Sequence, residues 1–293
     1  MLSLSRAADQ FIATLRARHA PINTVRSYAS DLRRFALVAP ADLVAIDGAV
    51  VRSFLESVDG QSPATRRRWD ATLRTFYRWA LREGLVAGNP MERVDPVKMI
   101  SRLPRPLDSD SVTAVLKSIP PSATRDRALF TLLYETGMRV SEALGVQYAD
   151  LELTPDDEKV RVLGKGQRER TVLLTAAPES SRLLRRHLKL SRIRSGSVFR
   201  GDPRYGGSAL PWGYTTARRA WQRYCAVAGV TATLHQLRHS RATQLVQAGV
   251  PLGTVRKVLG HRNIQSTLLY VEVDPATVKR DLLAYQRQRA RTR

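Results

Sequence analysis

The chain has 293 residues, of which 43% are hydrophobic, and this is enough for two folded domains with apolar cores. Its 48 lysines and arginines against 26 acidic residues give a formal charge of +22, which favours a nucleic-acid partner, although ribosome-like or membrane-surface proteins share such a charge. The single cysteine excludes an internal disulfide, and we expect a cytoplasmic protein because no transmembrane or signal-peptide pattern is present.

Residues 1–90 predict a helical domain. Apolar residues recur at helical spacing in four segments, each preceded by a good N-cap: Ser3 or Ser5, Asn23, Asp47, and Ser62 before Pro63. The fourth helix, which Gly84 ends, carries a row of arginines on its polar faces. A solvated charged face is the ordinary explanation. Because Asp70 is the single acid in its first turns, we favour contact with a DNA backbone through Arg66, Arg67, Arg68, Arg74 and Arg78.

Residues 91–106 predict an extended interdomain linker. Helical periodicity stops there, and the prolines Pro96, Pro104 and Pro106 appear. The segment is also basic, and we expect DNA contacts from Lys98, Arg102 and Arg105. Such a linker would let two lobes close around a duplex.

Residues 107–293 predict a second domain that is mainly helical. A helix from Arg125 to Thr136 ends at Gly137, and Arg139 follows, with Glu142 as a local ion-pair partner. Residues 160–174 alternate as a β-hairpin whose turn holds Lys165, which is ordinarily a solvated turn lysine. A helix is expected over 275–285, followed by a basic tail. The fold class is therefore mainly α with a small antiparallel β-sheet.

Residues 233–273 carry the densest chemistry. Thr233 and Gln236 form a capping-box pattern, and the helix that follows places His235, Arg238 and His239 on one face. Gly260 ends the next helix, so that His261 lies at a helix end ahead of Tyr270. The groups suit a phosphate; a zinc site is the alternative, but Gln236 stands where a metalloprotease helix has glutamate. We expect no metal and no cofactor.

In this order the motifs resemble those of the tyrosine recombinase (phage integrase) family, and most of all its Xer branch. The resemblance rests on TGMRVSEALG around Arg139, the GKG turn at Lys165, HQLRH from His235 to His239, LGH at His261, and Tyr270 nine residues later. It implies a two-domain DNA clamp, in which a helical SAM-like core-binding domain precedes the catalytic domain.

The resemblance also implies a mechanism without ATP or metal. Tyr270 attacks a DNA phosphodiester to form a 3′-phosphotyrosyl bond. The other implied catalytic residues are Arg139, Lys165, His235, Arg238 and His261: the arginines and His261 stabilise the phosphorane, Lys165 protonates the leaving 5′-oxygen, and His235 handles the proton of Tyr270. Glu142 has an orienting role, and His239 a structural one.

The partners implied are double-stranded DNA with a specific recombination site and further recombinase subunits. The C-terminal helix would join the chain into a tetramer on DNA, with itself or with a paralogous recombinase, in the cytoplasm near the nucleoid and away from membranes. Two alternatives stay open: a non-catalytic DNA-binding or architectural protein, and DNA relaxation of the type IB topoisomerase kind. An assay with two sites separates the last from recombination.

Overall fold

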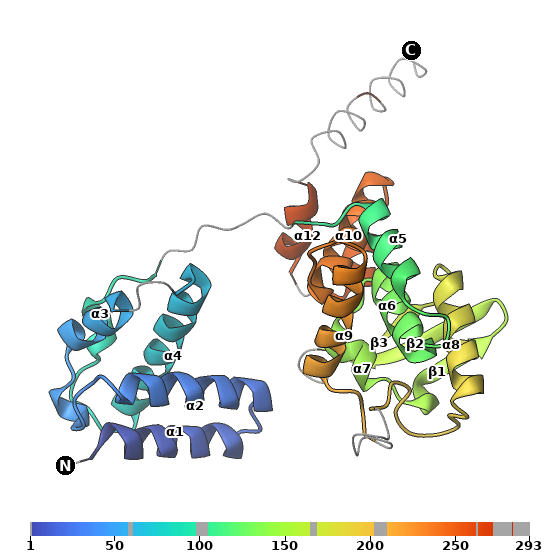
Figure 1. The fold of residues 1–293 in the computed structure, drawn as a ribbon. Coiled ribbons are helices and arrows are strands. Elements are labelled where there is room, and N and C mark those ends of the chain that lie inside the picture. Colours follow the sequence, from blue (N-terminus) through green and yellow to red (C-terminus); the bar gives the residue numbers. More distant parts are fainter. Residues whose placement is uncertain are drawn as a thin grey trace. The chain divides into compact units, whose positions relative to one another are not determined.

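The computed structural model describes residues 2–57, 61–97, 105–164, 169–201, 210–261, 263–271 and 283 (Figure 1). The chain divides into two compact units, Met1–Ser101 and Arg102–Arg293. None of the described helices is both long enough and apolar enough to cross a membrane.

The N-terminal unit is helical, as predicted. Its elements are α1 (Leu4–Ala17), α2 (Ile22–Ala36), η1 (Leu43–Ala45), α3 (Gly48–Glu56), α4 (Pro63–Arg82) and η2 (Pro90–Arg93). The predicted caps Ser3, Asp47 and Ser62 each accept a backbone N–H at the start of their helix. The predicted cap at Asn23 is wrong, because the residue at the cap position of α2 is Pro21, two residues earlier, whose fixed φ suits a helix start.

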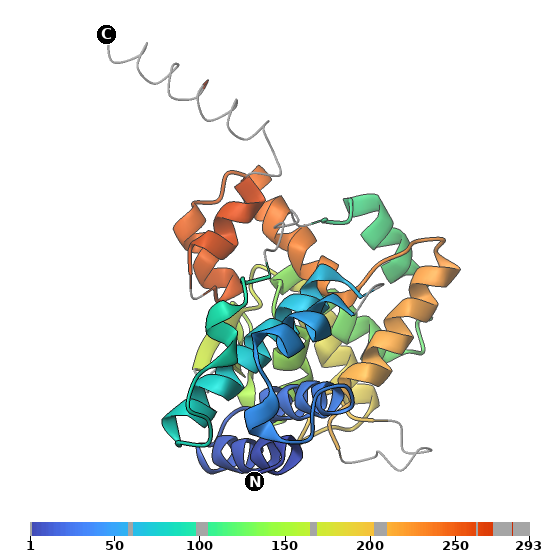
Figure 2. The same ribbon diagram turned by 90° about the vertical axis from the view of Figure 1, so that its left-hand side faces the viewer.

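Aromatic packing holds this unit together. The α1 and α2 helices lie side by side (Figures 1 and 2), and Phe11 of α1 packs against Phe76 and Trp79 of α4, with ring centroids 5.7 and 5.3 Å away. The buried Asp31 of α2 accepts hydrogen bonds from the side chains of Trp69 and Thr72, which fixes α2 against α4.

The first residues of the predicted linker are not extended. Met91 and Val94 are buried in the core of the N-terminal unit, and Arg74 donates to both of their carbonyl oxygens, at 3.1 and 2.6 Å. At the other end, Leu107 donates from its N–H to Ser240 Oγ at 2.8 Å. Apolar burial therefore attaches residues 91–94 to the helical unit, and residue 107 belongs to the second one. Residues 98–104 lie outside the described ranges.

The C-terminal unit is mainly helical around a three-stranded sheet. Its elements are α5 (Ser109–Ser118), α6 (Thr124–Thr136), α7 (Val140–Gly145), η3 (Tyr148–Asp150), β1 (Leu151–Thr154), β2 (Asp157–Leu163), β3 (Glu169–Leu173), α8 (Pro178–Leu190), α9 (Tyr214–Val227), α10 (Leu234–Gln247), α11 (Leu252–Leu259) and α12 (Gln265–Val271). The strands are antiparallel in the order β1-β2-β3, so the predicted hairpin and fold class are confirmed, while β1, α7 and α12 were not predicted.

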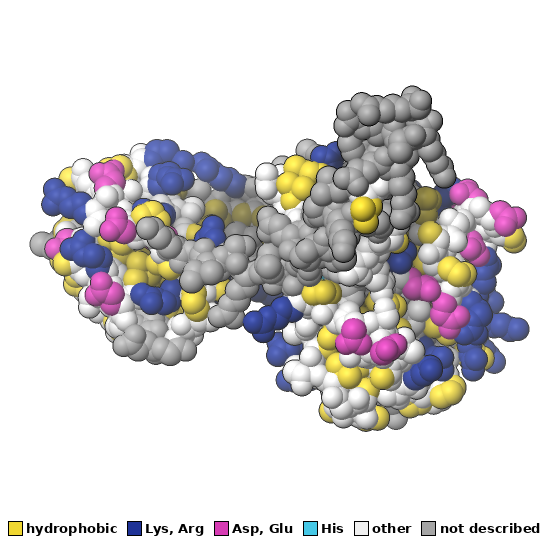
Figure 3. Space-filling view, turned by 90° about the horizontal axis from the view of Figure 1, so that it is seen from above, with side chains coloured by type: hydrophobic (Ala, Val, Ile, Leu, Met, Phe, Trp, Pro, Cys, Tyr) yellow, Lys and Arg dark blue, Asp and Glu magenta, His cyan; other side chains and the backbone are white. Residues whose placement is uncertain are grey.

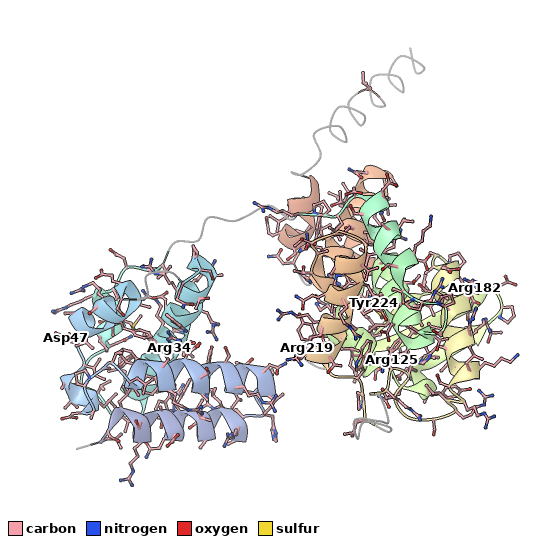
Figure 4. The ribbon with its side chains drawn as sticks, viewed as in Figure 1. Arg34, Asp47, Arg125, Arg182, Arg219 and Tyr224 are labelled. Atoms are coloured by element: carbon pink, nitrogen blue, oxygen red, sulfur yellow. The ribbon has the colours of Figure 1, made fainter. Side chains whose placement is uncertain are left out.

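Aromatic and ionic contacts tie α6 to α9 in the core of this unit. Phe130 packs against Trp221, and Tyr224 donates its hydroxyl proton to Asp126 at 2.8 Å. The neighbouring Arg125 places its guanidinium 3.8 Å from the ring of Trp212; Figure 4 labels Arg125 and Tyr224. These contacts set the position of α6, whose C-terminus leads into the candidate site.

The last three helices form a separate small cluster. In both views α10, α11 and α12 lie together (Figures 1 and 2). Their apolar contacts centre on Ala242, Val246, Val255 and Leu259, and Tyr270 packs among them. The short α12 is therefore held by its packing on α10 and α11, since seven residues alone form an unstable helix.

Candidate active site

Arg238 is the buried cation of the site. The α10 helix begins after Thr233, as predicted, and Gln236 accepts the Thr233 N–H at 2.8 Å. One turn into this helix the Arg238 side chain is 4% exposed and donates to the carbonyl of Gly137 at 2.8 Å. Gly137 ends α6 with a φ of +64°, so Arg238 neutralises an unpaired carbonyl at a helix C-terminus.

Arg139 lies two residues further along this turn and is partly exposed. Its Nη1 donates to Glu142 Oε1 at 2.7 Å, and its Nη2 donates to the carbonyl of Gly260 at 3.1 Å. Glu142 is buried and also accepts the backbone N–H of Arg139 at 2.8 Å, which caps α7. The ion pair expected from the sequence is present, and it aims Arg139 at the end of α11.

Arg170 is a member of the site that sequence reasoning missed. It lies on β3, donates from Nη2 to Glu142 Oε2 at 2.9 Å, and donates from Nη1 to the carbonyl of Val258 at 2.9 Å. The hairpin pattern predicts that this residue lies on a strand. It does not predict the hydrogen-bond partners, because both are distant in sequence. Burial opposes ionisation of Glu142, yet the hydrogen bond from Arg139 and the charge of Arg170 hold its pKa below the usual value.

His261 is fixed by the turn after α11. Gly260 ends that helix with a φ of +65°, as predicted, and the His261 N–H donates to the carbonyl of Arg256 at 3.0 Å. The His261 Nδ1 lies 2.9 Å from the hydroxyl of Thr267, a buried residue of α12. Thr267 also escaped the sequence analysis, since α12 itself was not predicted.

Tyr270 is 3% exposed, and its hydroxyl lies 2.8 Å from Nδ1 of His239. From the sequence, His235 is the expected partner of this phenol, and His239 has a structural role. Among the hydrogen bonds of the described residues, the one to the phenol is made by His239, because α12 packs over the second turn of α10. The ring centroids of His235 and His239 are 4.5 Å apart, so His235 lies next to the imidazole that contacts the phenol.

Burial and positive charge together tune the histidines. Burial lowers the pKa of His239 to about 4, assisted by His235 and Arg238. Burial likewise lowers the pKa of His261 to about 4, assisted by Arg238 and Arg139. The imidazoles are therefore neutral at pH 7, and each can offer one donor and one acceptor nitrogen.

The same environment acts on the other groups. Burial lowers the pKa of Arg238 to about 10, with Arg139 adding to the effect, and the guanidinium stays charged. Burial raises the pKa of Tyr270, which Arg238 partly opposes. The packed surroundings, with Arg238 and Arg139, lower the pKa of His235 even though its side chain is exposed.

A cleft of about 660 Å³ opens beside these groups. Its lining includes Arg139, Arg170, Gly260, His261 and the exposed pair Arg256 and Lys257 at the C-terminal end of α11. Arg256 and Lys257 are further cations that the sequence analysis did not single out. Glu142 and Glu169 also line the cleft, but the cations outnumber them, so the cleft suits a phosphodiester backbone.

Lys165 lies outside the described residues, which include Gly164 before it and Glu169 after it. Across the described part of the chain, no group of three or more His, Cys, Asp or Glu side chains could hold a metal ion. The cluster that the structure does bring together therefore consists of Arg139, Arg238, His235, His239, His261 and Tyr270, with Glu142 and Arg170 behind it.

The arginines of α4 have differing environments. Arg74 donates to Asp70 and to the carbonyl groups of residues 91 and 94, so it helps to hold the N-terminal unit together, and its predicted DNA contact stays a prediction. Arg68 pairs with Asp31 of α2 at 2.9 Å. This ion pair could not be predicted from the sequence of α4, because the acid lies on another helix. Arg66 donates to the Leu55 carbonyl.

The remaining predicted DNA contacts lie at the surface where they are described. Arg67, Arg78 and Arg105 are exposed, whereas Lys98 and Arg102 lie outside the described residues. Figure 3 shows lysine and arginine side chains in dark blue over both units, with acidic side chains interspersed. On this face, basic side chains are therefore present on both units, in keeping with the net charge.

Comparison with known proteins agrees with this architecture. Residues 105–277 match the model of the phage integrase family, and residues 8–84 match its N-terminal SAM-like domain. The chain is 36% identical to a tyrosine recombinase XerC of Rhodospirillum centenum, over 88% of this chain and 79% of that protein. It is 34% identical to a tyrosine recombinase XerD of Lacticaseibacillus casei, over 78% of each chain.

Two examples represent the solved structures that share the fold. One is XerH site-specific recombinase bound to a palindromic difH substrate, with a TM-score of 0.72 and 22% identity over 92% of this chain and 82% of that one. The other is a lambda integrase dimer bound to a COC′ core site, with a TM-score of 0.73 and 19% identity over 89% and 96%. The chain belongs to the phage integrase family.

Proposed function

We propose that Tyr270 is the nucleophile of this site-specific tyrosine recombinase. Its phenolic oxygen bonds to the phosphorus of a DNA phosphodiester, the bond from phosphorus to the 5′-oxygen breaks, and a 3′-phosphotyrosyl bond and a free 5′-hydroxyl result. The observation that carries the proposal is the hydrogen bond between the buried phenol and His239, on the helix that also holds Arg238. Because the bond energy is kept in the phosphotyrosine, rejoining needs no ATP.

The proposed phosphate ligands are Arg139, Arg238 and His261. The two guanidinium groups flank the turn after α6, and Arg139 contacts the carbonyl of Gly260 beside His261. Negative charge grows on the non-bridging oxygens in the transition state, and losing one such donor slows comparable reactions by about 10²–10³-fold.

Proton transfer is assigned to neutral imidazoles and to one lysine. We assign Nδ1 of His239 as the acceptor of the Tyr270 phenolic proton, and His235, the neighbouring imidazole, as a second group that handles that proton. With the hydroxyl of Thr267 donating to Nδ1 of His261, the Nε2–H of His261 is left to donate to the phosphate. Lys165 is our proposed acid for the leaving 5′-oxygen, by resemblance alone.

The proposed partner is double-stranded DNA that carries a specific recombination site. The exposed arginines Arg67 and Arg78 on α4, with Arg256 and Lys257 in the cleft, would contact its backbone. We also propose assembly into a tetramer on DNA; a lambda integrase tetramer bound to a Holliday junction has this fold, with a TM-score of 0.73 at 19% identity. The predicted C-terminal helix lies outside the described residues, apart from Leu283.

The test is a suicide substrate that carries the cognate site, in which cleavage releases a short strand and traps the covalent adduct. Wild type in EDTA is expected to form the adduct, and Tyr270→Phe is expected to form none while still binding the site. An adduct with the phenylalanine variant, or a strict need for metal, contradicts the mechanism. Strand exchange between two sites, compared with relaxation of a supercoiled plasmid, separates recombination from topoisomerase activity.

A further inference from the structure

Arg170 joins two segments that are far apart in sequence. Its guanidinium donates to Glu142 at the start of α7 and to the Val258 carbonyl near the end of α11, each at 2.9 Å. The side chain is only 16% exposed, although it starts from a strand of a small sheet. An arginine in this setting has exchanged most of its hydration for fixed partners.

Both partners of Arg170 lead directly to residues of the phosphate site. Glu142 binds Arg139 through its other carboxylate oxygen, at 2.7 Å. Val258 is followed two residues later by Gly260, whose carbonyl accepts from Arg139 at 3.1 Å. The hydrogen bonds therefore form a closed ring from Arg139 through Glu142 and Arg170 to the end of α11, and back to Arg139.

The turn after α11 is shaped around this guanidinium. A Cβ added to Gly260 would lie 2.6 Å from Nε of Arg170 and 2.9 Å from its Cδ, closer than real atoms approach. The Arg170 Nε is buried without a hydrogen-bond partner among the described residues, so the side chain keeps its place at some cost. Residue 260 must therefore be glycine for two reasons. Its φ is positive, and the Arg170 side chain occupies the space where a Cβ would lie.

The hydrogen-bonded ring also affects how far Glu142 neutralises Arg139. The Glu142 carboxylate is shared between two guanidinium groups. Without Arg170, its whole negative charge would face Arg139 and would compete with a phosphate for that cation. Because Arg170 shares the Glu142 carboxylate, Arg139 is only partly neutralised and can attract an anionic ligand in the cleft.

We infer that Arg170 is a positioning residue, which holds Arg139 and the turn of His261 around one phosphate and keeps Glu142 from neutralising Arg139. The inference rests on the proposed recombinase function. It predicts that loss of Arg170 weakens the stabilisation of negative charge on the non-bridging oxygens of the reacting phosphate.

The experiment compares two suicide substrates that differ at the scissile position only, a phosphodiester and an uncharged methylphosphonate. Arg170→Met is expected to slow single-turnover adduct formation on the phosphodiester by about 10²-fold, as loss of a phosphate donor does. On the methylphosphonate, which needs less positive charge, the deficit should fall below about tenfold. Affinity for the site, measured by gel shift, should change little.

Arg161→Met is the matched control. Arg161 lies on β2 beside the Arg170 position in the sheet register, its side chain is 53% exposed, and its ion pair with Asp150 is 3.7 Å long. This variant should behave as wild type on both substrates. Arg170→Lys, which keeps the charge and can reach one partner, should show a smaller deficit with the same dependence on substrate, and it carries the test if Arg170→Met does not fold.

The possible outcomes separate failure of the positioning role from failure of the recombinase function. Equal deficits on the two substrates, or wild-type rates for Arg170→Met, overturn the positioning role while leaving the recombinase function intact. Absence of a Tyr270-dependent adduct with wild type is a failure of the proposed function itself. A double-mutant cycle with Glu142→Gln adds a second measure: the two effects should be far from additive, and additive effects would contradict action through Glu142.

Discussion

The imidazole of His239 lies 2.8 Å from the hydroxyl of Tyr270, in a cluster where the phenol is 3% exposed. The two residues come from α10 and α12, and these helices are held together by an apolar cluster that includes Ala242, Val255, Leu259 and Tyr270. The nucleophile proposed here is therefore already in contact with a neutral proton acceptor in the chain alone.

His239→Phe should slow formation of the covalent adduct by about 10²-fold, the lower end of what proton-transfer groups contribute. The phenylalanine ring retains the packing against Tyr270 but accepts no proton. His239→Gln, whose amide oxygen still accepts a hydrogen bond, should lose about tenfold or less. Single-turnover cleavage with saturating enzyme measures both, and a wild-type rate for His239→Phe would remove this residue from the mechanism.

The stability of the protein should fall as the pH is lowered from 7 to 5. His239 and His261 have a pKa of about 4 in the folded chain. The pKa of His187 is lowered too, by burial, and that of His235 by its packed surroundings with Arg238 and Arg139. An unfolded histidine titrates near 6.5, so below that pH the unfolded chain takes up protons that the folded chain refuses. Their contribution is complete above about pH 6.5 and is lost as the pH falls towards 4.

Urea unfolding at pH 5, 6 and 7 checks this dependence. His239→Gln removes one of the depressed groups and should flatten the change of unfolding free energy with pH. The same slope in the variant and in wild type would show that His239 is not among the groups responsible.

Gly260→Ala should destabilise the protein more than Gly229→Ala. Both glycines have a φ near +65°, at +65° and +66°, so each alanine incurs about 1 kcal/mol of backbone strain. A Cβ at residue 229 meets nothing within 4 Å among the described residues, whereas one at residue 260 meets Arg170 at 2.6 Å. We expect an additional cost of roughly 1–3 kcal/mol for Gly260→Ala from this overpacking.

Denaturant unfolding and adduct formation should be measured on both glycine variants. Gly229→Ala should cleave at the wild-type rate, since residue 229 lies after α9 and outside the cleft lining. Equal destabilisation by the two substitutions would mean that the turn adapts to the added methyl group.

Arg74→Met and Arg78→Met should have different effects, although the two residues are one turn apart on α4. Arg74 donates to Asp70 and to two carbonyl groups after α4, so its loss should lower stability by roughly 1–3 kcal/mol. Arg78 is exposed, and its loss should leave stability unchanged while weakening DNA binding.

Binding of a cognate duplex at several salt concentrations separates these effects. Arg78→Met should reduce the slope of log affinity against log salt by about 1, as expected for one lost phosphate contact. An unchanged slope for Arg78→Met, or an intact stability for Arg74→Met, would contradict the assignment made from the contacts of α4.

Local signals predicted the elements that depend on neighbouring residues. Ser62 before Pro63, Asp47, and the glycines after α6 and α11 each stand where the sequence placed a helix start or stop. By contrast, α12 was not predicted, because a helix of seven residues is stabilised by α10 and α11 rather than by its own sequence. The arginines of α4 were predicted to form one DNA-contacting surface. In the structure Arg68 pairs with Asp31 on α2, and Arg74 donates to the Val94 carbonyl after α4, so these two arginines also make contacts within the protein.

The sequence by itself determined which side chains share a helix face, and so which groups could serve one phosphate, because the period of an α-helix is fixed by local geometry. Only the tertiary structure decided that His239 meets the phenol, that Arg170 stands behind Arg139, and that Arg74 is structural. The physical reason is that hydrogen-bond partners of buried groups come from whichever segments apolar packing brings together, and these lie up to 88 residues away in the case of Arg170 and Val258.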